Sequence, residues 1–424
     1  MHDPVFTMTS AAPPPASPTA AALDTTPPAP GSGPQARRPH LLHVFPSFVP
    51  GGVPIRIATI INLLAGRYRH TVIAMDGRYE CRTRIDPSCD VAVRPPPVTA
   101  DPVRTVLRLR TALRDIAPDL LLTYNWGAIE WALANAPRPL CPHLHFESGF
   151  GPEEADGQLR RRALIRRLAL HRTTSLVVPS QTLVEIATGL WHIPSHKVTY
   201  VPNGVDVAAL AAGLSTADRS RFRKGENEVV VGTLAPLRRE KNLARLIRAF
   251  ARAGNDVPAR LVIAGDGPER ANLERTAQET GIAARVTFTG HVDDIVTVLG
   301  ALDVFVLSSD TEQMPNSLLQ AMAAALPVAA TDVGDIRRIV AEDNRPFVVP
   351  RDDEAALATA LRRVIDDRDL RTRLGALNRE RVRNHYGMER MLARYRELYD
   401  TCLEASGDAG SAPHIGAGSR PGGQ

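Results

Sequence analysis

The chain has 424 residues, of which 44% are apolar and 23% charged, and its formal net charge is +5. This composition is typical of a globular protein of two or three domains. No apolar stretch is long enough for a membrane-spanning helix or has the form of a secretory signal, so we expect a cytoplasmic protein. The four cysteines are too few and too scattered for a disulfide framework or a zinc site, and we expect Cys81 and Cys89 to be buried free thiols.

The basic residues are almost all arginines: only three of 51 are lysines, and none of these follows a glycine. A Walker-type phosphate loop is therefore excluded. Arginines concentrate in 157–172, which has no acidic residue, and in 371–396, where eight arginines meet two glutamates. Solvated helix faces and contact with an anionic surface, either phospholipid or a diphosphate-linked acceptor, both remain open for these stretches. Stacking aromatics are absent from the first stretch, and we expect no nucleic-acid partner.

Short apolar runs alternate with amphipathic stretches along most of the chain. We expect disorder in the Pro/Ala-rich extension 1–38 and in the tail 405–424, which are poor in apolar side chains. Unbroken runs rich in Val, Ile and Leu favour parallel strands that are buried on both faces. Such runs occur in the first half at 41–45, 71–75, 119–123, 142–146, 175–179 and 197–201.

The same alternation restarts after a looser polar stretch, which indicates a second sheet. The runs of the second half lie at 228–234, 259–265, 284–290, 302–308, 326–331 and 346–349. Two such series predict an α/β protein with two Rossmann-like, doubly wound parallel-sheet domains. We place the first domain at 39–208, a connector at 209–227 and the second domain at 228–387. Ligands of such sheets bind beyond the carboxyl ends of the strands, so the segments after each run are the candidate sites.

Two segments of the first half carry candidate residues. After the first run, Gly51 and Gly52 open a helix whose free amides can meet an anion, although a turn with no ligand is also open. In 142–151, His145 and Glu147 lie at a strand end before a glycine-bearing loop. A structural histidine and a functional one are both open for His145.

A cationic turn follows the first run of the second half. Arg238, Arg239 and Lys241 lie between a strand and the next helix, where cations oppose the helix dipole unless an anion compensates. A lysine in a chain so poor in lysine indicates a site for a compact ammonium group, such as a phosphate contact. A solvated turn is the alternative.

The stretch 308–331 is the richest in candidate residues. A strand ends near Ser308, and Pro315 begins a helix whose first turn holds Asn316 and Ser317. That helix N-terminus can hold phosphate oxygens through its amides and hydroxyls. Glu312 can accept hydrogen bonds from a sugar, and the amide of Gln320 can bind vicinal hydroxyls.

In this order and spacing, the motifs resemble a retaining glycosyltransferase of family 4, in the group 1 glycosyl transferases, with the two-domain GT-B fold. The resemblance covers about 40 to 403 and implies that a last helix, 388–404, joins the N-terminal domain. The segments that carry it are GGVPIR (51–56), HLHFESG (143–149), VPNGVD (201–206), VGTLAPLRREKN (231–242), IAGDGPE (263–269), FTGHVDD (288–294) and TEQMPNSLLQAMAAALPVAATDVGD (311–335).

The resemblance implies a role for each candidate residue. His145 and Glu312 would be catalytic, with Glu312 meeting hydroxyls of the donor sugar. Lys241 would contact the donor diphosphate. The other residues implied in binding the nucleotide sugar are Gly51, Gly52, Arg239, Asn316, Ser317, Leu318 and Gln320.

Two positions depart from the family pattern. Gln320 stands where the family has a second glutamate that holds the ribose, and Pro236 stands where it has an arginine. Arg238 or Arg239 would have to replace that arginine. We expect no metal and no cofactor besides the donor, because the cations of the chain can stabilise the leaving diphosphate.

The expected function is transfer of a sugar to a saccharide or lipid-linked saccharide acceptor, with retention of configuration, in polysaccharide or cell-envelope glycan synthesis. We expect the protein in the cytoplasm and peripherally at the inner face of the membrane. The main alternative is a weak or inactive homologue that binds a nucleotide sugar without transfer. A sugar-nucleotide epimerase, which can share this fold, is a third.

Overall fold

The computed structural model describes residues 37–150, 152–154, 157–218, 220–222, 225, 227–254 and 258–409. The chain divides into Met1–Arg37 and Arg38–Gln424, and only the second unit is described below. The predictions for 1–36 and 410–424 lie outside the described residues.

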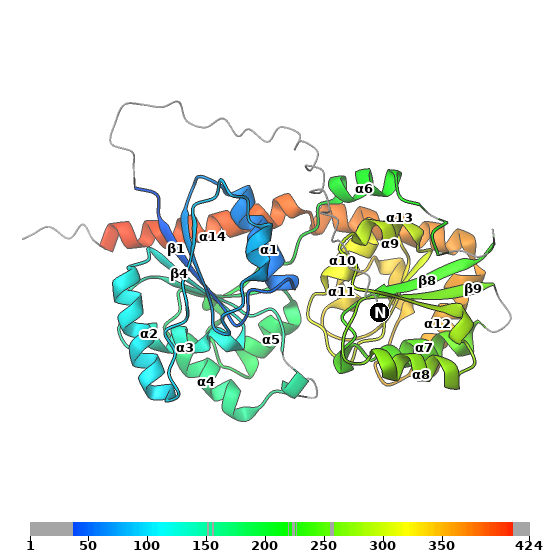
Figure 1. Cartoon of the computed structure of the whole chain (residues 1–424), viewed down its shortest axis with the longest axis horizontal. Helices are drawn as coiled ribbons and strands as arrows, with labels where there is room; N and C mark the ends of the chain where they lie inside the picture. The colour runs from blue at the N-terminus through cyan, green and yellow to red at the C-terminus, as the bar shows by residue number, and fades with distance from the viewer. Residues whose placement is uncertain are drawn as a thin grey trace, which may run out of the picture. The chain divides into compact units, whose positions relative to one another are not determined.

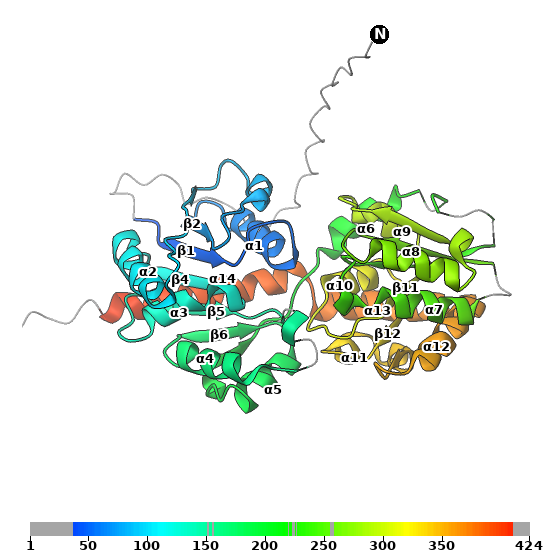
Figure 2. The same cartoon turned by 60° about the horizontal axis from the view of Figure 1, so that its bottom comes forward.

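The first half of this unit forms a seven-stranded parallel sheet in the order β3-β2-β1-β4-β5-β6-β7. Helices pack on both of its faces, as Figures 1 and 2 show. The strands are β1 (His40–Phe45), β2 (Arg69–Ala74), β3 (Val91–Val93), β4 (Leu120–Tyr124), β5 (His143–Phe146), β6 (Ser175–Val178) and β7 (Val198–Tyr200). The helices are α1 (Gly52–Leu63), α2 (Pro102–Ile116), α3 (Ile129–Asn135), α4 (Arg160–Leu170) and α5 (Gln181–Gly189).

The second half forms a six-stranded parallel sheet in the order β10-β9-β8-β11-β12-β13. The strands are β8 (Val229–Leu234), β9 (Ala259–Ala264), β10 (Val286–Gly290), β11 (Val304–Leu307), β12 (Val328–Thr331) and β13 (Val348–Val349). The helices are α6 (Val207–Ser215), α7 (Leu243–Ala253), α8 (Arg270–Glu279), α9 (Ile295–Ala301), α10 (Asn316–Ala323), α11 (Ile336–Ile339), α12 (Glu354–Asp366) and α13 (Arg368–His385).

Burial of the strands explains why the apolar runs predicted them. The central strands β1, β4, β5 and β11 are buried at every position, so their side chains contact helices on both faces of the sheet. Each predicted run contains a strand, and the predicted pair of doubly wound parallel sheets is confirmed. All four cysteines are buried and none forms a disulfide within the described part of the chain, so Cys81 and Cys89 are buried thiols as predicted.

The last helix, α14 (Met388–Ala409), begins beside the second sheet and runs along the first, as both cartoons show. Its Met391, Tyr395 and Tyr399 belong to the same apolar core as strands of the first sheet. The helix continues past residue 404, where we expected the ordered part to end. The chain thus crosses between the sheets twice, and the two crossings touch where Val205 exchanges backbone hydrogen bonds of 2.9 and 3.0 Å with Tyr386 and Met388.

The first sheet contains buried histidines that are held neutral. His43 lies 2.9 Å from the Tyr124 hydroxyl and 3.0 Å from the ring of His70. Burial lowers the pKa of His70 to about 4, and burial together with neighbouring histidines lowers the pKa values of His43 and His143 well below their usual range.

We expect acid to destabilise the first sheet well before its carboxylates titrate. In the unfolded chain these histidines bind protons below about pH 6.5, while the folded chain binds them only at lower pH. The contribution of these histidines to the free energy of unfolding is therefore fully present above about pH 6.5. It falls as the pH drops from there toward 4, by up to about 1.4 kcal/mol per pH unit for each histidine. Urea unfolding at several pH values measures this slope. His70→Gln should make it shallower, and a substitution of the exposed His171 should leave it unchanged.

Candidate active site

The strand orders locate the cleft of this protein. Each order reverses direction once, between β1 and β4 in the first sheet and between β8 and β11 in the second. A doubly wound sheet binds ligands beyond the strand ends at such a reversal. The segments that follow these four strands, together with the loop after β5, line one cleft of about 580 Å³.

An ion pair in this cleft joins two of the predicted residues. Lys241 ends a short 3₁₀ turn after β8, and Glu312 lies in the loop after β11. The lysine Nζ lies 2.5 Å from the glutamate Oε1, which also accepts a hydrogen bond of 2.8 Å from Ser309. Their side chains are 18% and 9% exposed, so the pair is partly shielded and yet open to the cleft. The lysine can therefore meet an incoming anion while the carboxylate meets hydroxyl groups.

The N-terminus of α10 borders this pair. Asn316 and Ser317 begin the helix and line the cleft, and their amides precede Leu318, whose N–H bonds to the Pro315 carbonyl at 3.2 Å. Free amides at a helix start favour anions. The side chain of Leu318 is fully buried in the core of the second sheet, so the structure brings Asn316 and Ser317 to the cleft but not the Leu318 side chain.

A second helix N-terminus faces the first across the cleft. Gly52 is the first residue of α1 and lines the cleft. A Cβ added to it would lie 3.4 Å from the side-chain amide nitrogen (Nδ2) of Asn316. The positive ends of α1 and α10 therefore converge on one place. Gly51 caps α1 in an extended conformation and is not among the residues that line the cleft.

The side chains of the cationic turn after β8 line two different hollows. Arg238 and Pro236 line the cleft with Lys241. Arg239, the predicted contact, lines a separate hollow together with Asn242. The structure thus brings Arg238, and not Arg239, to the ion pair.

Gln320 lies on α10 one turn beyond the helix start. It lines a hollow of about 310 Å³ that neighbours the cleft. Gly52 and Asn316 line both spaces, so the two hollows adjoin at the start of α10.

His145 is placed behind the cleft wall, at the end of β5, and is fully buried. Its Nδ1 lies 2.7 Å from the hydroxyl of Thr123, which also lies 2.7 Å from Nε2 of His143. Its Nε2 has no hydrogen-bond partner and lies 3.9 Å from an oxygen of Glu147. Buried polar nitrogens usually have a hydrogen-bond partner, so this Nε2 marks His145 as a candidate for a role beyond packing.

Within the arginine-rich stretch 157–172, the sequence pattern did not single out Arg166. Its side chain is fully buried and forms two hydrogen bonds of 2.8 and 3.0 Å to the carboxylate of Glu154. Its Nε lies 3.4 Å from Glu147. Its guanidinium carbon lies 4.8 to 5.3 Å from the ring centres of Trp126, Phe150 and Trp191.

The sequence also missed a polar wall between the two sheets. Arg56 donates to Asn203 and, at 2.9 Å, to Ser148. The amide of Asn203 in turn donates to Asn316 and to the Met314 carbonyl, both at 2.9 Å. These residues lie in the motif segments that carry the family resemblance, but the sequence does not show that they contact one another.

Hydrogen bonds to the start of α5 support the loop that carries Glu312. Asp335 accepts hydrogen bonds from the backbone amides of Gln181 and Thr182 at the start of α5, at 2.6 and 3.0 Å. Gly334, with φ +56°, sits so close that a Cβ would lie 2.3 Å from the Glu312 carbonyl. Only glycine fits this turn, which therefore fixes where Glu312 can lie.

Within the described ranges, no group of three or more His, Cys, Asp or Glu side chains is arranged to hold a metal ion. None of the described helices is both long and apolar enough to cross a bilayer.

Two protein-family models match the chain: Glycosyltransferase Family 4 at residues 50–209 and Glycosyl transferases group 1 at 215–381. The 2-deoxystreptamine N-acetyl-D-glucosaminyltransferase of Streptomyces fradiae is 28% identical over 70% of this chain and 74% of its own length. The N-acetyl-alpha-D-glucosaminyl L-malate synthase of Bacillus anthracis is 25% identical over 49% of this chain. The chain spans about half the length of the first curated relatives it matches, 54% for two of them.

Solved structures show the same architecture. HepE from Anabaena in complex with UDP has a TM-score of 0.72 at 18% identity, covering 85% of this chain and 100% of that chain. A glycosyltransferase from Rickettsia africae also has a TM-score of 0.72, at 14% identity, covering 87% of this chain and 99% of its own. The predicted GT-B fold is thereby confirmed.

Proposed function

Because the chain belongs to the family 4 glycosyltransferases of group 1, we propose that it transfers a sugar from a nucleotide-sugar donor to a saccharide or lipid-linked saccharide acceptor, with retention of anomeric configuration. We place this activity in polysaccharide or cell-envelope glycan synthesis. The observation that supports it most directly is the Lys241–Glu312 pair between the N-termini of α1 and α10.

The cleft is suited to stabilise a departing nucleoside diphosphate. Negative charge grows on the diphosphate as its bond to the sugar breaks, and prearranged positive groups stabilise that charge. Lys241, Arg238 and the free amides of Asn316 and Ser317 supply such groups. Glu312 is then released from Lys241 to accept hydrogen bonds from the sugar.

The remaining chemistry needs little from side chains. The acceptor hydroxyl attacks the anomeric carbon from the face that the diphosphate leaves, and an oxygen of the departing phosphate takes its proton. We propose that His145, with its unpartnered Nε2 next to Glu147, supports the sugar side of this reaction.

The test begins with a thermal-shift screen of the full chain against UDP, GDP, ADP and their sugars. The donor that stabilises the protein is then incubated with saccharide acceptors, and the anomeric configuration of the product is read by NMR. We expect transfer with retention, at a rate that a chelator leaves unchanged, because the charge stabilisation comes from Lys241 and Arg238. Neither binding nor turnover of any nucleotide sugar would overturn the proposal.

Binding without transfer is a second candidate, favoured by Pro236 in the cleft and by Gln320 beside it. Proline offers no cation to the diphosphate, and glutamine brings no charge to a ribose. Donor binding by calorimetry with neither transfer nor donor hydrolysis would support this candidate. Change of the free donor without any acceptor would instead indicate an epimerase.

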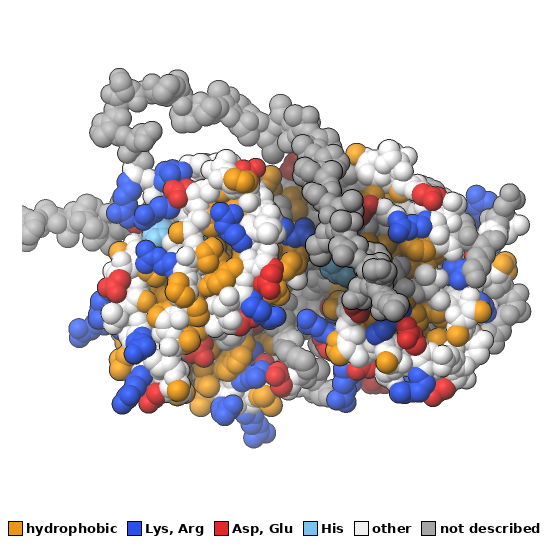
Figure 3. Space-filling model, viewed as in Figure 1, with side chains coloured by type: hydrophobic (Ala, Val, Ile, Leu, Met, Phe, Trp, Pro, Cys, Tyr) orange, Lys and Arg blue, Asp and Glu red, His pale blue; other side chains and the backbone are white. Residues whose placement is uncertain are grey.

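We also propose a peripheral membrane contact through α4 and the neighbouring α2. On α4, Leu164 and Leu168 are 55% and 60% exposed between exposed arginines. On α2, Val103 and Leu107 are 71% and 62% exposed, and α3 packs between the two helices. Figure 3 shows basic and apolar side chains side by side over this part of the surface. Exposed leucines among arginines are the composition that anionic bilayers bind.

We expect the chain to sediment with vesicles that contain phosphatidylglycerol and to bind less as NaCl rises from about 0.05 to about 0.5 M, because salt screens exposed charge. Leu164→Ser/Leu168→Ser should weaken binding at every salt concentration. The matched control is Leu63→Ser, on α1, where the leucine is 48% exposed. Binding that ignores salt, or that both variants reduce equally, would contradict this contact.

A further inference from the structure

A second hollow lies where the chain crosses between the two sheets, and it is distinct from the cleft. It has a volume of about 420 Å³, within the range of roughly 300–1,000 Å³ that small-molecule sites occupy. Its walls come from the end of β7, the end of α13 and the start of α14. We call it the hinge hollow; its lining residues include Tyr200, Asn203, Arg381, His385, Arg390 and Arg394.

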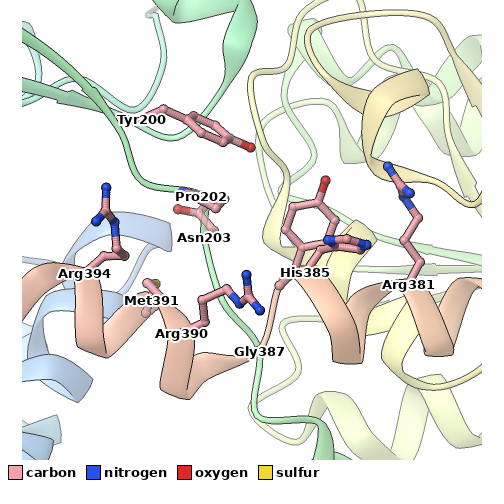
Figure 4. Close-up of a pocket in the computed structure, with 10 residues that line it drawn as sticks. Tyr200, Pro202, Asn203, Arg381, His385, Gly387, Arg390, Met391 and Arg394 are labelled. Atoms are coloured by element: carbon pink, nitrogen blue, oxygen red, sulfur yellow. The ribbon is translucent and has the colours of Figure 1, made fainter. Parts of the chain in front are cut away.

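The lining of the hinge hollow is cationic. Three arginines and a histidine line it, and among the described residues that line it there is no carboxylate. By contrast, Glu240 and Glu312 offset the basic residues of the cleft. Figure 4 shows Arg390 and Arg394 extending from α14, and Arg381 from α13, toward the side where Tyr200 lies. Guanidinium groups that gather around one concave space attract an anion.

These cations differ in how they are held. Arg381 donates hydrogen bonds of 2.7 Å to the carbonyls of Ile339 and Arg338, which fixes its guanidinium beside the hollow. The side chains of Arg390 and His385 form no hydrogen bond or ion pair within the described part of the chain. Arg394 pairs at 2.6 Å with Glu397, which is 61% exposed, and exposed pairs of this kind stabilise little. At least two arginines are therefore available to a ligand.

Arginine selects the class of anion. Its planar donor fork matches the oxygens of phosphate, to which it can make two parallel hydrogen bonds. Tyr200 and Tyr386 supply rings and hydroxyls for the remainder of a ligand. We propose that the hinge hollow is a binding site for a phosphate-bearing anion, either a free phosphate compound or a lipid headgroup.

The position of the hinge hollow connects it to the cleft. Asn203 lines both spaces and donates to Asn316 at the start of α10. The hollow also lies over both chain crossings, where Val205 pairs with Tyr386 and Met388. An anion bound there contacts segments that lead into both sheets, one side chain away from the donor site.

The experiment is calorimetric titration of the full chain with inorganic phosphate. We expect Arg390→Ala/Arg394→Ala to weaken phosphate binding at least about tenfold, which is about 1.4 kcal/mol. Arg396→Ala is the matched control, because Arg396 is exposed on the same helix but does not line the hollow. The cleft is the same in all three proteins, so its own affinity for phosphate does not affect the difference. Equal binding by the double variant and the wild-type chain would overturn the site.

Two further measurements locate the anion and its source. Crystals soaked in tungstate should show an anomalous peak in the hinge hollow, and a peak in the cleft alone would overturn the proposal. Sedimentation with phosphatidylglycerol vesicles separates the sources. If the double variant also binds these vesicles less than Arg396→Ala does, the phosphate belongs to a lipid headgroup. If vesicle binding is equal while phosphate binding is lost, the ligand is a free phosphate compound.

Discussion

Lys241→Ala is expected to lower kcat/KM for sugar transfer by about 10²–10³-fold, the loss that follows removal of one group that stabilises transition-state charge. The loss should fall mainly on kcat, because the charge on the departing diphosphate grows as the bond breaks. Lys241 is suited to this role by its place between the starts of α1 and α10 and by its contact with Glu312. Steady-state kinetics with the donor found in the ligand screen measures the effect.

The neighbouring Arg239 provides a matched control. It belongs to the same 3₁₀ turn but lines a different hollow, so Arg239→Ala should leave kcat/KM close to that of the wild-type chain. Glu312→Ala should also reduce transfer, since we propose that its carboxylate accepts hydrogen bonds from the donor sugar. Thermal unfolding of each variant shows whether the fold is kept. Equal losses in the Lys241 and Arg239 variants, or unchanged transfer by Glu312→Ala, would contradict these roles.

The architecture could be predicted from the sequence because buried parallel strands leave a strong local signal. The central strands are short, mostly apolar runs such as LLLTY and VFVL, and the chain alternates these runs with helices. The strand that was missed, Val91–Val93, is a partly exposed edge strand of only three residues. Its pattern is too short to stand out from a loop.

The candidate site was predictable in part, where chemistry follows directly after a strand. Lys241, Glu312 and Asn316 fit that rule, and the structure brings them together in one cleft. The choice between Arg238 and Arg239 depends on how a turn orients two adjacent side chains, which the sequence does not encode in any spacing. The burial of His145 depends on packing by distant segments in the same way.

Arg166 illustrates the same limit, because a buried arginine looks like its solvated neighbours in the sequence. The structure encloses it among aromatic rings and pairs it with the carboxylate of Glu154, while Glu147 lies 3.4 Å away with one oxygen unpartnered. Burial alone would raise the pKa of Glu154, but the hydrogen bonds and charge of Arg166 hold that pKa below its usual value. The stabilisation from Glu154 is therefore present above about pH 4.3 and is lost as the pH falls through its folded pKa.

Arg166→Met is expected to lower the free energy of unfolding by about 3–5 kcal/mol, because it keeps the volume but removes the buried cation beside Glu147 and Glu154 and leaves Glu154 only the longer contact of 3.5 Å with Arg162. Urea unfolding of the full chain measures the change in the transition that involves the first sheet. Arg167→Met is the matched control: Arg167 is exposed on the same helix, and we expect its variant to stay within about 0.5 kcal/mol of the wild-type chain. Glu154→Gln added to Arg166→Met should recover part of the loss, since it removes a buried charge that has lost its closest cation. An Arg166→Met variant as stable as Arg167→Met would contradict a stabilising role for the buried pair of Arg166 and Glu154.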